Sequence, residues 1–174
     1  MKKILLRAFI YALVCMIILF GLTAILSEKA SFGIQEVIGY AGIVLSLLFV
    51  YFGIRQYRDQ VNGGYLSFGQ GLKVGLLIVL IPAILFASFD LIYTMFINPD
   101  FFNEYYTTYL EQMRATLPAA EFEAKAKELE AQKELFSNKP VQFGLMFIIV
   151  FAIGVIITVI SSLVLRKNIN TRVA

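Results

Sequence analysis

Asp90 is the one carboxylate inside the four long apolar runs of this 174-residue sequence. Acids within membrane-spanning segments often bind a proton or a cation. At about 1.5 Å per residue of helix, Asp90 lies about 7 Å outward from the middle of its run, and Tyr40 and Thr23 lie about 8 and 9 Å outward in theirs. This similar depth predicts a proton or cation site that the three side chains share. Alternatively, the span covers only residues 71–89, Lys73 reaches toward the head groups, and Asp90 is hydrated at the outer interface.

The composition argues against most catalytic and metal chemistry. The sequence contains no His, no Trp and a single Cys, Cys15. Without His there is no imidazole base, no Ser-His triad and no His-bound metal. One Cys provides neither an internal disulfide nor a thiolate metal cage. We therefore expect no metal, no cofactor and no enzymatic activity, and no nucleic-acid partner, because no basic face is interleaved with aromatic residues.

The apolar runs are the elements that must position Asp90. Hydrophobic residues make up 59% of the chain and charged residues 16%, and the mean hydropathy is +0.78. A soluble domain of this size carries about 25% charged residues, whereas a helix needs about 20 apolar residues to cross a bilayer core. The sequence therefore predicts one membrane domain over residues 1–174, with transmembrane helices at 8–26, 37–54, 74–97 and 141–165. The first run is longer than a signal-peptide core of about 7–15 residues, so we expect it to be retained.

The basic residues predict the orientation of these spans. Apart from Lys29 and residues 98–140, they form three clusters, and four spans place all three clusters on the same side. The positive-inside rule assigns that side, with both termini and the 55–73 loop, to the cytoplasm. Residues 98–140 then lie outside. Three basic residues of the 55–73 loop are predicted to contact lipid head groups, namely Arg55, Arg58 and Lys73.

Residues 98–140 predict a separate helical insertion. Pro118 divides them into two stretches, 99–116 and 118–137, and apolar residues recur at helical spacing in both. This pattern is typical of an amphipathic helical hairpin. Two interpretations remain open. The helices pack on each other and on the membrane surface, or they form a docking platform for another protein of the cell envelope.

Small residues repeat at i+4 spacing within the spans and predict close helix packing, because they let helix backbones approach each other in lipid. They serve either packing inside one bundle or the face of a homo-oligomer. The residues concerned are Gly42 and Ser46 in the second span, and Gly154, Thr158 and Ser162 in the fourth.

The loop after the second span is rich in glycine. Residues 53–59 read GIRQYRD and residues 62–69 read NGGYLSFG. The spacing of Gly64 and Gly69 fits a P-loop, but Gln70 stands where that motif needs Lys, so phosphate binding of this kind is not expected. The two strings, together with NPDF at 98–101, resemble the signature of the family called domain of unknown function 4199. The resemblance covers nearly the whole chain and implies a bacterial inner-membrane protein of this architecture, with no known activity and no catalytic residues to transfer.

The predicted fold class is therefore all-α: an integral membrane four-helix bundle with an extracytoplasmic amphipathic helical hairpin between the third and fourth helices. The favoured function is a non-enzymatic scaffold or accessory protein of the bacterial inner membrane, with both termini cytoplasmic. Its partners are the lipid bilayer, an envelope protein that docks through 98–140, and a second copy in a homo-oligomer. The alternative is a small oligomeric transporter or channel that uses Asp90.

Overall fold

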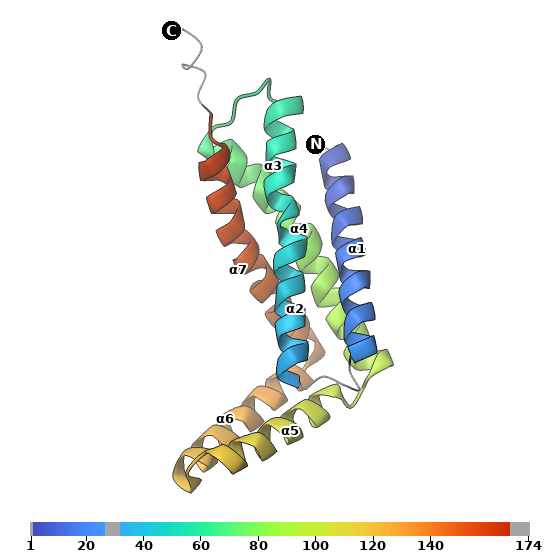
Figure 1. Ribbon diagram of the computed structural model, residues 1–174, viewed down its shortest axis with the longest axis vertical. Coiled ribbons are helices and arrows are strands. Elements are labelled where there is room, and N and C mark those ends of the chain that lie inside the picture. The colour runs from blue at the N-terminus through green and yellow to red at the C-terminus, as the bar shows by residue number, and fades with distance from the viewer. Residues whose placement is uncertain (1, 27–31, 168–174) are drawn as a thin grey trace. The chain divides into compact units, whose positions relative to one another are not determined.

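The protein is all-α. The computed structural model describes residues 2–26 and 32–167 (Figure 1). Helices make up 89% of it, and the described residues form no strand beyond an isolated bridge between Leu66 and Lys167. In chain order the elements are α1 (Lys2–Leu26), α2 (Phe32–Leu47), α3 (Phe49–Gln60), α4 (Phe68–Ile92), the π-helix η1 (Tyr93–Ile97), α5 (Phe101–Thr116), α6 (Ala119–Ser137) and α7 (Lys139–Leu165).

Three helical segments of the described chain are long and apolar enough to cross a membrane. They are Val37–Gln60, which covers most of α2 and all of α3, Phe68–Ile97, which covers α4 and η1, and Lys139–Leu165, which is α7. Such helices are typical of a membrane protein. The predicted first span, 8–26, lies within α1, and its role as a fourth transmembrane segment stays a prediction.

Local irregularities divide the long helices at defined residues. The N–H of Leu48, between α2 and α3, is shared by the carbonyls of Val44 and Leu45 at 3.0 and 3.3 Å. At the end of η1, the N–H of Asn98 donates to the carbonyl of Tyr93 at 2.8 Å, five residues back. The helix stops there because the next residue is Pro99, and a residue before proline avoids the helical region.

The chain separates into two compact units. The first comprises Met1–Phe86 and Phe147–Ala174. In it α1 contacts α2 and α3, and the α1 residues Ala8 and Ala12 are buried. Helices α4 and α7 approach closely because Gly71 faces Ser162: a Cβ atom on Gly71 would lie 2.7 Å from the Ser162 hydroxyl oxygen.

The second unit comprises Ala87–Met146 and contains η1, α5 and α6. Helices α5 and α6 lie side by side (Figure 1). They are joined at Leu117, whose backbone is extended before Pro118. The rings of Phe102 on α5 and Phe136 on α6 are 5.3 Å apart. The apolar stripes of the two helices therefore meet at the open end of the pair.

Candidate functional site

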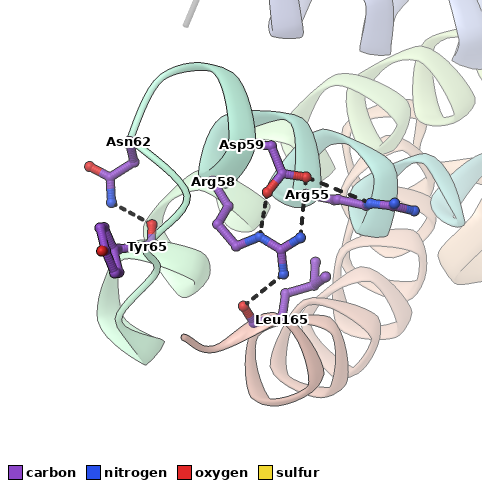
Figure 2. Close-up of polar contacts among 6 residues, drawn as sticks. All are labelled: Arg55, Arg58, Asp59, Asn62, Tyr65 and Leu165. Atoms are coloured by element: carbon purple, nitrogen blue, oxygen red, sulfur yellow. Dashed lines mark hydrogen bonds and ion pairs between the residues drawn. The ribbon is translucent and has the colours of Figure 1, made fainter. Parts of the chain in front are cut away.

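The loop between α3 and α4 is held to the end of α7 by a compact set of polar contacts (Figure 2). We use the name helix-end clasp for residues 55–70 together with residues 165–167. The chain leaves α3 through Gly63 and Gly64, whose φ angles are +63° and +86°. Residues with a Cβ atom rarely adopt this left-handed backbone conformation, so glycine is favoured at both positions.

Arg58 is the central side chain of the helix-end clasp. Its Nε donates to Asp59 Oδ1 at 2.7 Å and its Nη2 donates to Oδ2 at 3.2 Å. Its Nη1 donates to the carbonyl of Leu165 at 3.4 Å (Figure 2). That carbonyl belongs to the last turn of α7, where backbone acceptors lack helical partners and the helix dipole favours a cation. Arg58 therefore ties the end of α3 to the end of α7.

The second half of the clasp fixes the start of α4. Leu66 and Lys167 exchange two backbone hydrogen bonds of 3.0 Å, and Leu66 is fully buried. The N–H of Gln70 donates to Ser67 Oγ at 3.2 Å, while Gln70 Oε1 accepts from the Ser67 N–H at 3.0 Å. This is a reciprocal capping box at a helix start. Asn62 Nδ2 also donates to the Tyr65 carbonyl at 2.7 Å.

The three predicted head-group residues differ in their surroundings. Arg58 is bound to protein groups, and its side chain is 20% exposed. Arg55 lies 3.7 Å from Asp59, measured from Nε to Oδ2, yet its side chain is 57% exposed. Lys73, in the second turn of α4, is exposed. Contact of these three residues with lipid head groups stays a prediction.

Asp90 belongs to a polar network in the second unit, which we name the Asp90 cluster. Gln142 Nε2 donates to Asp90 Oδ2 at 2.7 Å and to Thr94 Oγ1 at 2.8 Å. The Thr94 hydroxyl is 3.1 Å from the backbone carbonyl of Asp90, to which it donates. Lys139 Nζ donates to Gln142 Oε1 at 3.2 Å. The buried amide of Gln142 thus has partners for both its donor and its acceptor groups, as burial requires.

The other predicted members of the Asp90 site lie elsewhere in the chain. Tyr40 belongs to the first unit and is 49% exposed. Thr23 lies in α1, and its side chain is outside the described residues. A polar layer of Asp90, Tyr40 and Thr23 therefore stays a prediction. Sequence reasoning missed Thr94 and Gln142, although Thr94 follows Asp90 by one helical turn and Gln142 is the amide at the start of the last apolar run.

The small residues of α7 pack against α4 within the first unit. Gly75 faces Thr158 and Gly154 faces Val79, each too closely for a Cβ atom on the glycine. The Thr158 and Ser162 hydroxyl oxygens are buried, and neither has a hydrogen-bond partner among the described residues. In α2, Gly42 and Ser46 are also buried, and Ser46 Oγ donates to the Ile43 carbonyl at 2.9 Å. These positions serve contacts inside the chain.

A groove of about 410 Å³ runs between α5 and α6. Its apolar lining is Tyr106, Leu110, Phe122, Ala126 and Leu129, and its charged lining is Glu123, Lys127, Glu130 and Lys133. Burial raises the pKa of the Tyr106 hydroxyl above its ordinary value. The groove is therefore an apolar strip bordered by both signs of charge.

Comparison with known proteins finds the same family that the loop sequence indicates. The family model described as "Protein of unknown function (DUF4199)" matches residues 6–167. No curated protein and no solved structure gives a significant match. The matched region includes the helix-end clasp, the Asp90 cluster and the groove between α5 and α6. The resemblance predicted from residues 53–69 and 98–101 is thus confirmed, and the chain belongs to the DUF4199 family.

Proposed function

We propose that this protein is a non-enzymatic scaffold of the bacterial inner membrane that presents the α5–α6 hairpin to another envelope protein. The proposal combines the three apolar helices with α1 as a fourth span, so that both termini lie on one side of the membrane and the hairpin on the other. The basic clusters support the cytoplasm as the side of the termini. The observation that carries it is the groove between α5 and α6.

The chemistry of the groove suggests the kind of partner. Leu110, Phe122 and Leu129 offer an apolar strip, while Glu123 and Lys127 on α6 border it with opposite charges. An amphipathic helix presents a complementary surface, with apolar residues at i, i+3 and i+7 and charged residues beside them. We therefore propose that the occupant is an amphipathic helix of a second, membrane-anchored protein.

Site-specific photocrosslinking tests this proposal. A photoreactive amino acid at Ala126, which lines the groove, should crosslink to one membrane-anchored protein, and the adduct should map to an amphipathic helix of that partner. The control is the same amino acid at Ala131, which is exposed on α6 and does not line the groove. With the photoreactive amino acid moved to Lys133, which also lines the groove, the matched variants Ala126→Phe and Ala131→Phe can be compared. Only Ala126→Phe, which fills the groove, should abolish the adduct. Equal crosslinking from the Ala126 and Ala131 positions, or adducts with a second copy of this chain, would overturn the proposal.

The alternative function, a small oligomeric transporter or channel, rests on Asp90. We take the middle of α7 as the bilayer centre, and the hydrogen bond between Asp90 and Gln142 then supports a similar depth for the two side chains. Gln142 lies about 15 Å from the middle of the 27-residue helix α7. This equals half of a hydrocarbon core of about 30 Å. The Asp90 cluster then lies at the edge of the core, where it suits helix packing better than transport across the centre. Transport would require Asp90→Asn to abolish flux in reconstituted vesicles while the protein remains folded.

A further inference from the structure

We propose that the helix-end clasp binds the phosphate of an anionic phospholipid head group. Arg55, Arg58 and Lys167 gather around one carboxylate, that of Asp59. Arg55 and Arg58 contact Asp59 directly, and Lys167 is close enough to act on it electrostatically. Asp59 is the one acidic residue between Glu36 and Asp90 in the sequence. The clasp therefore carries positive charge that its own carboxylate does not neutralise.

The Arg58 side chain and the Lys167 backbone are held in place by other groups of the protein. Arg58 is fixed by Asp59 and by the Leu165 carbonyl (Figure 2). The backbone of Lys167 is paired with Leu66. The loop between them is shaped by its two left-handed glycines. Because Arg58 and the backbone of Lys167 are already ordered, an anion that binds there does not have to order them, and such preorganisation increases affinity.

The position of the clasp favours a lipid over a phosphate in solution. Two candidate membrane segments end in the clasp, at Gln60 and Leu165, and a third begins there, at Phe68. Large apolar side chains are exposed in the adjoining turns, Phe52 on α3 and Leu163 and Val164 on α7. Acyl chains can therefore lie on these side chains while the head group meets Arg55 and Lys167. Basic pockets at the ends of membrane helices recognise anionic head groups in this way.

Native mass spectrometry of the full-length protein tests the site. The protein is exchanged into micelles that contain phosphatidylcholine and phosphatidylglycerol in equal amounts, and the retained lipid is counted. We expect the native chain to retain phosphatidylglycerol in preference. A basic residue near an anionic head group contributes about fivefold in affinity. The variant carrying Arg55→Gln and Lys167→Gln should therefore lose about 25-fold of this preference.

Two control variants remove the same amount of charge elsewhere. Arg114→Gln with Lys125→Gln changes two exposed positions of the second unit outside the α5–α6 groove, and Lys2→Gln with Lys3→Gln changes the start of α1 in the first unit. Both should keep the preference for phosphatidylglycerol, and circular dichroism should show equal helix content in all variants. An equal loss of this preference in the α1 control would mean that it comes from the overall positive charge at the membrane surface. That result would overturn the clasp site. Equal retention of both lipids by the native chain, or full displacement of phosphatidylglycerol by inorganic phosphate, would also overturn it.

Discussion

Replacing Gln142 with leucine removes the side chain that holds the Asp90 cluster together. The native amide donates to Asp90 and Thr94 and accepts from Lys139. A hydrogen bond to a charged group contributes about 1.5–3 kcal/mol in proteins, and side-chain hydrogen bonds in membranes average about 0.6 kcal/mol. The Asp90 and Thr94 bonds alone then give an expected loss of about 2–4 kcal/mol in the free energy of unfolding for Gln142→Leu.

A double-mutant cycle separates this effect from a general effect of the leucine. The variants Gln142→Leu, Asp90→Leu and their combination are unfolded in mixed micelles and followed by circular dichroism. Replacing both Asp90 and Gln142 by apolar groups leaves neither end of their hydrogen bond unsatisfied. The loss in the double variant should therefore be smaller than the sum of the two single losses by more than about 1 kcal/mol. Gln132→Leu, on an exposed position of α6, should change little. Additive losses, or a loss for Gln142→Leu no larger than the control, would refute the cluster.

Three further predictions concern the contact between α4 and α7 and the α5–α6 hairpin. Gly75→Ala places a methyl group against Thr158 and should lower the thermal midpoint, at a cost of about 1–3 kcal/mol. The control Gly69→Ala should leave the thermal midpoint unchanged, because open space surrounds Gly69. Thr158→Val removes a buried hydroxyl without a partner among the described residues and should stabilise the protein by about 1 kcal/mol in the same assay. A destabilised variant would show that the hydroxyl has a favourable contact. Because the pKa of the Tyr106 hydroxyl is raised, the folded state keeps this proton to a higher pH than the unfolded state does. Stability should therefore fall as the pH rises above about 10 in the native chain, and less so in Tyr106→Phe, in pH-dependent unfolding.

Much of the helical organisation is readable from local sequence. Long apolar runs predict helices because their backbones must be satisfied internally in lipid. The stop at Asn98-Pro99 and the break at Pro118 follow from proline geometry. These signals act between close neighbours in the chain. They indicate an all-α fold with a pair of amphipathic helices before the last apolar run.

The partners of the polar side chains depend on contacts between distant segments. Asp90 and Gln142 are 52 residues apart, and their pairing requires the end of α4 to pass the start of α7. Arg58 reaches Leu165 across 107 residues. Periodicity within a helix carries no information on which helix lies beside it. For the same reason, the sequence does not show that Gly71 and Gly75 of α4 lie against Ser162 and Thr158 of α7.

The location of the α5–α6 hairpin outside the cytoplasm is the central claim, and cysteine labelling tests it most directly. Cys15 is the single cysteine of the chain, so Cys15→Ser provides a background without thiols. On it, Ala131→Cys places a thiol on α6, and Val61→Cys places one in the helix-end clasp, both at exposed positions. In spheroplasts, a membrane-impermeant maleimide should label the Ala131→Cys variant at once and the Val61→Cys variant only after the membrane is permeabilised. Labelling of the clasp position in intact spheroplasts, with the hairpin position protected, would contradict the proposed orientation and with it the scaffold function.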